Sequence, residues 1–309
     1  MSKHVLVTGG AGLIGSHLAD AYLARGWRVS IVDNLSTGDR ANLNPDAKLY
    51  EMDIREERTA RVIEELRPDV ISHHAAQIDV RTSVADPAFD AEINVVASVR
   101  LLQTAAKAGV ERFIFASSGG AMYGEPQHAP QREDHPVLPL SPYGCAKLSF
   151  EHYLDCYREV YGFRTIALRY ANVYGPRQNS HGEAGVVAIF TDRMLAGQGV
   201  TINGSGEQTR DFVYVGDVVA ANMAVSEGDW SGAYNVGTGV ETSVNRMYEL
   251  LAAAMGIDRE AAHGPAKAGE QMRSVLDGTK LRKAAGLPEP LGFREGLEKT
   301  VAYFRNERR

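Results

Sequence analysis

The sequence has few of the features that mark secreted, membrane-spanning or nucleic-acid-binding proteins. Only two of its 309 residues are cysteines, so a disulfide framework is implausible and a reducing cytoplasm is the expected compartment. No apolar run approaches the roughly 20 residues that span a bilayer, and the N-terminus MSKHVLVTGG lacks the apolar segment of a secretory signal. A formal net charge of −6 argues against nucleic acid as a partner.

The remaining composition is that of a folded globular chain. Hydrophobic residues make up 44% of the sequence and charged residues 23%, which is enough apolar surface to bury a core. The length suggests one large domain or two modest domains that share a cleft.

Short apolar runs and helical patterns alternate along the first half of the chain. We expect strands at residues 4–8, 28–33, 48–52, 68–72 and 112–116, and helices at residues 14–25, 55–66 and 89–108. This alternation predicts an α/β fold, a Rossmann-type doubly wound parallel sheet with helices on both faces. We expect this domain to occupy residues 1–174, with about residues 211–240 returning to it. Residues 175–309, including a helix at 244–255, are expected to form mainly a smaller α/β lobe.

A glycine-rich segment lies between the first strand and the first helix. Gly9, Gly10, Gly12 and Gly15 fit the spacing that lets backbone amides approach a pyrophosphate at a helix N-terminus. Asp33 ends the second strand, where a carboxylate accepts hydrogen bonds from a ribose and repels a 2′-phosphate, so NAD is favoured over NADP. Two alternatives stay open after the third strand, where Asp53 and Ile54 either touch the adenine or belong to a solvated turn. A nearby cation, Arg40, is expected at the surface.

Tyr143 and Lys147 begin another predicted helix and lie four residues apart, so they share one helical face. A buried ammonium beside NAD would lower the pKa of the phenol and provide a tyrosinate base. Cys145, between them, is expected to be a packed thiol rather than a nucleophile.

Several motifs together resemble one family. They are VLVTGGAGLIGSHL, VDNLSTG, MDIR, HHAAQ, FASSGGAMYGE, SPYGCAK, LRYANVYGPRQ, TRDFVYVGDVV and YNVGTG. The chain is identified as a member of the extended short-chain dehydrogenase/reductases, the NAD-dependent epimerase/dehydratase family. The resemblance implies inversion of C4 of a UDP-hexose through a 4-keto intermediate. It also implies a homodimer through the helices near residues 89–108 and 143–161. Alternatives are a UDP-glucuronate 4-epimerase, another sugar-nucleotide epimerase or 4-ketoreductase, and a non-catalytic NAD-sensing protein.

The family's catalytic hydroxyl, a Ser or Thr after the fifth strand, falls on Gly119 in this sequence. Ser118 and Ser117 are the nearest hydroxyls. Ser118 is preferred by proximity, but strand alternation places Ser117 on the face of position 119, so the choice stays open. The next residues, Gly120 and Ala121, are not acids, so the pair that would eliminate water is missing.

The glycine loop and the resemblance together assign a larger set of residues to the dinucleotide. These are Gly9, Gly12, Leu13, Ile14, Gly15, Asp33, Asn34, Ser36, Thr37, Gly38, Asp53, Ile54, His74, Ala75, Ala76, Gln77, Asn94, Tyr143, Lys147 and Tyr170. His73 and His74 have no third ligand at suitable spacing, so no metal is expected.

The resemblance also implies contacts to the sugar nucleotide. The residues are Gln77, Ser118, Tyr143, Asn172, Val187, Asn203, Arg210, Lys267, Glu270, Arg273 and Ser274. Arg210 would contact the diphosphate, although a salt bridge to Asp211 is the alternative. Ser274 falls where some members of the family carry a Tyr, so we expect that N-acetylated hexoses are accepted too.

Overall fold

The computed structural model describes residues 2–180, 185–266 and 271–307. Its centre is a seven-stranded sheet in the order β10-β6-β5-β4-β1-β2-β3, and every neighbouring pair in it is parallel. The strands are β1 (His4–Thr8), β2 (Arg28–Asp33), β3 (Lys48–Glu51), β4 (Val70–His73), β5 (Arg112–Ser118), β6 (Arg164–Tyr170) and β10 (Gly232–Val236). The expected doubly wound α/β fold is confirmed.

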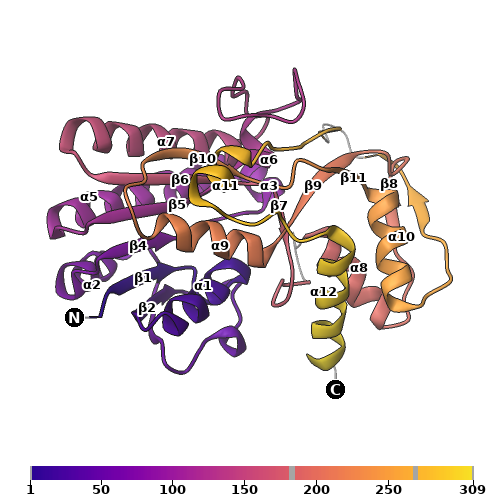
Figure 1. Ribbon diagram of the computed structural model, residues 1–309, viewed down its shortest axis with the longest axis horizontal. Helices are drawn as coiled ribbons and strands as arrows, with labels where there is room; N and C mark the ends of the chain where they lie inside the picture. Colours follow the sequence, from indigo (N-terminus) through magenta and orange to yellow (C-terminus); the bar gives the residue numbers. More distant parts are fainter. Residues whose placement is uncertain (1, 181–184, 267–270, 308–309) are drawn as a thin grey trace.

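Helices cover both faces of this sheet (Figure 1). On one face, α1 (Leu13–Ala24), α9 (Val215–Val225) and α11 (Thr279–Ala285) pack against alternate strand residues in one apolar cluster. On the other face, α2 (Glu57–Leu66), α5 (Ser98–Ala108) and α7 (Pro142–Tyr161) build a second cluster. Strand residues buried on both sides explain the continuous apolar runs in the sequence.

The helix expected at residues 89–108 is present as continuous helical backbone from residue 87 to 108, but it contains a π-helical segment that the sequence did not predict. After α3 (Val80–Ala85), the chain forms α4 (Pro87–Ala91), a π-helical segment η2 (Glu92–Ala97) and then α5. Asn94 lies within η2, and its amide donates to the carbonyl oxygen of Gln77 and to the carboxylate of Asp90, both at 2.9 Å. Wide turns of this kind often lie at functional sites.

The remaining elements form a smaller body at one end of the sheet, at the right of Figure 1. This body contains two short sheets. The first has three strands, β7 (Asn172–Tyr174), β9 (Thr209–Tyr214) and β11 (Glu241–Ser243), and the second pairs β8 (Thr201–Asn203) with β12 (Ala262–Gly264). The helices α8 (Val186–Leu195), α10 (Val244–Met255) and α12 (Phe293–Glu307) share a third apolar cluster. Within the described residues, no helix combines the length and the apolar character needed to cross a bilayer.

Two short elements complete the description. A 3-10 turn, η1 (Arg40–Asn42), follows β2, and α6 (Gly119–Met122) follows β5. Both lie after the carboxyl ends of their strands, the edge where ligands bind in open parallel sheets.

Candidate active site

The glycine loop between β1 and α1 is shaped for a close backbone approach. Gly9 has φ +71°, and a Cβ on it would lie 2.7 Å from the backbone nitrogen of Ala75. A Cβ on Gly15 would lie 2.2 Å from the carbonyl oxygen of Gly9. Gly12 caps α1 without a side-chain hydrogen bond, so the amides of the first turn, at Leu13 and Ile14, have no intrahelical acceptor. The loop is therefore a cradle for a phosphate group.

Asp33 ends β2 beside this loop. Its buried carboxylate accepts hydrogen bonds from the backbone nitrogens of Ala11 at 2.9 Å and Leu35 at 2.8 Å. The segment that follows closes on the same loop, because a Cβ on Gly38 would lie 2.7 Å from the Cβ of Ala11. Thr37, next to Gly38, accepts a 3.1 Å hydrogen bond at its carbonyl oxygen from Asn179. Residues of the expected adenosine site thus surround the loop.

The acid after β3 belongs to a local turn. The Asp53 carboxylate accepts hydrogen bonds from Arg55 and from Asn34, and the side-chain bonds from Arg55 hold the pKa of Asp53 below its usual value. Ile54 is buried in the core. Arg40 pairs with Glu51 at the surface, as expected from the sequence. These contacts favour the local-turn interpretation of Asp53.

The buried His73 ends β4, and the half-buried His74 follows it. Thr8 is hydrogen-bonded to the His73 ring at 2.7 Å and accepts from the backbone nitrogens of His74 and Ala75, so β4 runs directly past the glycine loop into Ala75 and Ala76. Burial lowers the pKa of His74 to about 3 and holds that of His73 well below its usual value. Both rings are neutral at physiological pH. Among the described residues, no three His, Cys, Asp or Glu side chains converge as around a metal ion.

A second polar cluster lies between β4 and η2. The backbone nitrogen of Gln77 donates to Asn94 at 3.1 Å, and the Gln77 amide donates to Asp90 at 2.9 Å. Asp90 is buried, and burial raises the pKa of its carboxyl group. The sequence indicated Gln77 and Asn94 as candidates but not Asp90, although an acid one helical turn before Asn94 was a usable signal.

Tyr143 and Lys147 meet the end of β5 from the first turns of α7. Lys147 is buried, its Nζ donates a 3.0 Å hydrogen bond to the carbonyl oxygen of Ala116, and it lies 5.7 Å from the centre of the Tyr143 ring. The Ser118 hydroxyl lies beside the Tyr143 phenol and acts to lower its pKa. Burial lowers the pKa of Lys147 to about 8 and raises that of Tyr143 to about 12. The sequence predicted that Lys147 beside NAD would lower the phenol pKa. The surrounding residues of the chain, taken alone, raise it instead.

The two candidate serines have different partners. The hydroxyl of Ser117 donates to the Glu151 carboxylate at 2.5 Å, whereas Ser118 meets the Tyr143 phenol. A side chain at position 119 would require Leu276 to move, because a Cβ there would lie 2.4 Å from Cδ1 of this fully buried residue. The geometry thus favours Ser118. Cys145 is exposed, so the expectation of a packed thiol was wrong.

Residues expected to hold the sugar nucleotide approach α6 from two sides. An ideal Cβ on Gly120 would lie 3.7 Å from the Asn172 side-chain oxygen and 3.8 Å from the Ser274 hydroxyl. These two residues therefore lie next to the loop that follows Ser118. Tyr170, at the end of the adjacent strand β6, accepts a 2.8 Å hydrogen bond from Asn222 and is hydrogen-bonded to His74.

Among the other expected substrate residues, Arg210 lies on β9 beside the segment of Arg273 and Ser274, because the backbone nitrogens of Thr209 and Asp211 donate to the carbonyl oxygens of Met272 and Ser274 at 2.9 Å. The Asp211 carboxylate accepts hydrogen bonds from Thr238, Gly239 and Leu276, and Arg210 donates to the carbonyl oxygen of its neighbour Thr209 at 2.8 Å. The remaining residues stand as follows: Arg273 pairs with Glu241 at the surface, Val187 is buried in α8, Asn203 ends β8, and Lys267 and Glu270 lie outside the described residues.

Comparison with known proteins gives a consistent result. The model of the NAD dependent epimerase/dehydratase family matches residues 5–237. A UDP-glucose 4-epimerase from Mycolicibacterium smegmatis is 45% identical over 308 residues, covering 98% of both chains.

Two solved structures are similar over nearly the whole chain. The Thermotoga maritima UDP-glucose 4-epimerase with UDP-glucose has a TM-score of 0.96 and 47% identity, covering 99% of this chain and 100% of that chain. The Thermus thermophilus UDP-glucose 4-epimerase in complex with NAD has a TM-score of 0.93 and 45% identity, covering 98% and 99%. Both solved structures therefore have the same fold as this chain along nearly its whole length.

Proposed function

The chain belongs to the NAD-dependent epimerase/dehydratase family, and we propose that within it the protein is an isomerase that inverts C4 of UDP-hexoses. The observation that carries this proposal is the grouping of Tyr143, Lys147 and Ser118 at the end of β5. The grouping lies at the carboxyl edge of the sheet, next in order to β4 and β1, where the glycine loop begins. A proton-transfer group and a dinucleotide cradle therefore share one edge.

The residues around the loop fit NAD. Gly9 and Gly15 pack against backbone atoms that a Cβ would strike, which keeps the turn tight. The first turn of α1 offers amides for the pyrophosphate, and Asp33 suits a ribose. Bound NAD would supply the reversible hydride acceptor at C4, so the reaction needs no net oxidant. Lys147, Asn94 and Tyr170 are the side chains that we assign to the nicotinamide half of the site.

Tyr143 is the group that exchanges the proton of the sugar 4-hydroxyl. The neighbouring Ser118 hydroxyl opposes the increase in the phenol pKa that burial causes. The Lys147 side chain is partly protonated near pH 8. Its positively charged form favours the ionised phenol. After the 4-keto sugar has rotated in the site, the hydride would return to the opposite face of C4 while Tyr143 returns the proton to the 4-oxygen, so C4 would have the opposite configuration.

The residues after Ser118 favour epimerisation over elimination of water. Gly119, Gly120 and Ala121 have no acid or base to deprotonate C5 or protonate a leaving hydroxyl. Ser274 approaches the same segment and is a small side chain. We therefore include N-acetylated UDP-hexoses among the substrates.

Mass spectrometry of the ligand released by heat, together with sugar-nucleotide assays, tests this proposal. We expect NAD in the released fraction, and interconversion of UDP-glucose with UDP-galactose and of the N-acetylated pair. Accumulation of free NADH would indicate a dehydrogenase instead. Turnover of UDP-glucuronate alone would indicate a uronate epimerase, and NAD binding without turnover would indicate a sensing protein.

We also propose a homodimer in the cytoplasm. The outer surface of α7 and the neighbouring η2 exposes Val96, Tyr153, Val160 and Tyr161, more apolar area than a monomer normally leaves to water. A second copy of this helical face would cover it. The two cysteines are both unpaired and exposed, which supports a reducing compartment.

A further inference from the structure

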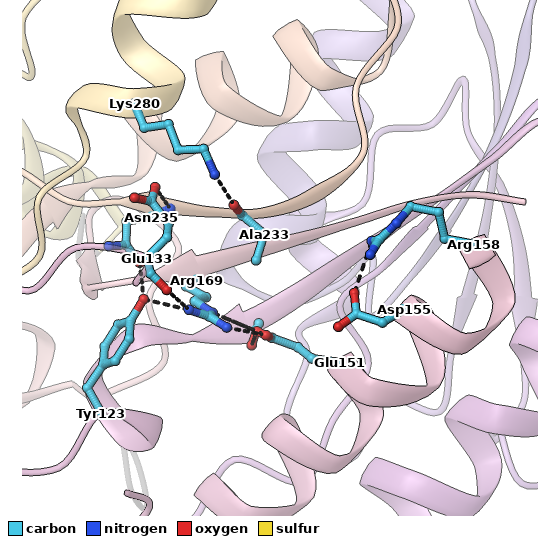
Figure 2. Close-up of polar contacts among 10 residues, drawn as sticks. Tyr123, Glu133, Glu151, Asp155, Arg158, Arg169, Ala233, Asn235 and Lys280 are labelled. Atoms are coloured by element: carbon cyan, nitrogen blue, oxygen red, sulfur yellow. Dashed lines mark hydrogen bonds and ion pairs between the residues drawn. The ribbon is translucent and has the colours of Figure 1, made fainter. Parts of the chain in front are cut away.

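A charged network is buried under α7 (Figure 2). Arg169 on β6 donates to the Glu151 carboxylate of α7 through Nη2 at 2.7 Å and Nε at 3.1 Å. Its Nη1 donates to the Tyr123 hydroxyl at 2.7 Å. Ser117 on β5 donates to the same carboxylate. The side chains of Arg169 and Glu151 are only 10% and 6% exposed, so this is an interior ion pair.

We propose that the Glu151–Arg169 pair is a positioning element that holds α7, and with it Tyr143 and Lys147, in register against β5. We further propose that the same network fixes the segment that carries Ser274. Both statements rest on the proposed function, because they concern the geometry of its reacting groups. Ser117 then serves as the link between the pair and β5 rather than as a catalytic hydroxyl.

The first argument is the matching of three successive strand residues to three turns of one helix. Tyr143, Lys147 and Glu151 are spaced by four residues and form one stripe on α7. Lys147 binds the carbonyl oxygen of Ala116, Glu151 binds Ser117, and Tyr143 lies beside Ser118. A slip of α7 along the strand would break all three contacts together.

The second argument concerns what apolar packing cannot supply. Around this stripe, α7 meets β5 through rings such as Phe150 and Phe115, whose centres lie 4.6 Å apart. Apolar contacts of this kind are non-directional. A buried ion pair adds little net stability, and its best-attested use is to specify one register. The hydrogen bonds of Arg169 and Ser117 to Glu151 are directional, so they can fix the register of α7 where the apolar packing cannot.

The third argument is that the network continues toward the substrate side. The Tyr123 hydroxyl donates to the Asn235 side-chain oxygen at 2.8 Å, and the Asn235 amide donates to the carbonyl oxygen of Gln131 at 3.0 Å. The backbone of Gln131 pairs with the segment after Ser274, donating to the carbonyl oxygen of Val275 at 2.8 Å. A continuous chain of buried hydrogen bonds therefore joins α7 to the segment that carries Ser274.

The test compares two hydrogen bonds that each connect α7 to the central sheet. Ser117→Ala removes the link of Glu151 to β5. Thr165→Val is the matched control, because the buried Thr165 hydroxyl ties β6 to α7 through the carbonyl oxygen of Leu154 at 2.9 Å, far from the reacting groups. Asp155→Asn, which removes the outer pair of α7 with Arg158 at 2.9 Å, controls for helix charge.

We expect Ser117→Ala to lower kcat about tenfold, the scale of a small misplacement of reacting groups, with KM for UDP-glucose within twofold of the parent value. Thr165→Val should lower the melting temperature similarly and leave kcat within twofold, and Asp155→Asn should change neither. Equal kcat in Ser117→Ala and Thr165→Val would overturn the positioning of α7. Tyr123→Phe should raise KM severalfold with kcat within twofold, and an unchanged KM would overturn the extension to Ser274.

A second measurement separates this inference from the proposed function. Amide hydrogen exchange of the NAD-loaded protein reports the first turns of α7 directly. We expect faster exchange there in Ser117→Ala than in Thr165→Val, and equal exchange would contradict the proposal even if the parent protein proved inactive on UDP-hexoses. A parent protein without epimerase activity would refute the proposed function alone.

Discussion

Lys147 donates a 3.0 Å hydrogen bond from its Nζ to the carbonyl oxygen of Ala116, two residues before Ser118 on β5. This bond fixes a buried ammonium 4.6 Å from the centre of the Phe115 ring and 5.7 Å from that of Tyr143. A flexible side chain thus becomes a charge at a set place beside the phenol.

Removing the Tyr143 hydroxyl should greatly slow proton exchange with the sugar. We expect Tyr143→Phe to lower kcat by about 10²–10⁴-fold, the range for a general acid–base group. Ser118→Ala should cost about 10-fold to 100-fold, because the phenol loses its oriented partner. Steady-state assays with UDP-galactose measure both, and the exposed Ser149→Ala on α7 is the control. Parent-like turnover by Tyr143→Phe would refute the assigned role.

The buried Lys147 should give opposite pH dependences of activity and stability. Because its pKa falls from 10.5 to about 8, kcat should decline as the pH rises through 8 and the ammonium is lost. Between pH 8 and 10.5 the unfolded chain binds more protons than the native one, so the free energy of unfolding rises with pH, by about 3 kcal/mol at most. Urea unfolding should show this rise in the parent and a smaller one in Lys147→Met. Identical slopes would argue against the lowered pKa.

The glycine cradle should not tolerate a methyl group. In Gly15→Ala the new Cβ would meet the backbone oxygen of Gly9 at 2.2 Å, so we expect a loss of about 3 kcal/mol in stability and little retained NAD. Thermal unfolding and the absorbance of released nucleotide measure the two effects. Gly199→Ala, where a Cβ meets nothing within 4 Å, should behave like the parent, and equal NAD content in both variants would contradict the cradle.

The small side chain at position 274 should set the range of sugars. A Tyr there would occupy space next to Gly120, so Ser274→Tyr should lower kcat/KM for the N-acetylated substrate more than for UDP-glucose, by about tenfold or more. Ser274→Ala keeps the space and should keep the ratio. The ratio of the two specificity constants is the decisive number, and an unchanged ratio in Ser274→Tyr would remove the assignment.

Charge on the outer face of α7 should separate the proposed dimer. We expect Tyr153→Asp combined with Tyr161→Asp to halve the mass in sedimentation equilibrium, since each residue is exposed and apolar. Val240→Asp places the same charge on an exposed apolar residue after β10 and should leave the mass unchanged. A parent protein that sediments as a monomer would rule out the dimer.

Much of the fold was predictable because the strand and helix periods agree with burial on both sheet faces. The strand at 4–8, the strand at 28–33 and the helix at 244–255 match the structure residue for residue. The π-helical turn at η2 was not predictable, because it depends on side chains such as Asn94 that reach Gln77 across the fold.

The site was predictable where spacing alone brings groups together. Tyr143 and Lys147 share a helical face, and Asp33 follows the glycine loop at a regular interval, so local geometry suffices. The choice between Ser117 and Ser118 needed the packing of α7 on β5. Asp90 and Arg169 were missed because their importance comes from burial, which a polar letter in a sequence does not reveal.

The contact between Gly119 and Leu276 makes two distant positions interdependent. Leu276 fills the space that a side chain at 119 would need, so a serine at 119 would require the leucine to move or to become smaller. A change at either position is therefore constrained by the residue at the other.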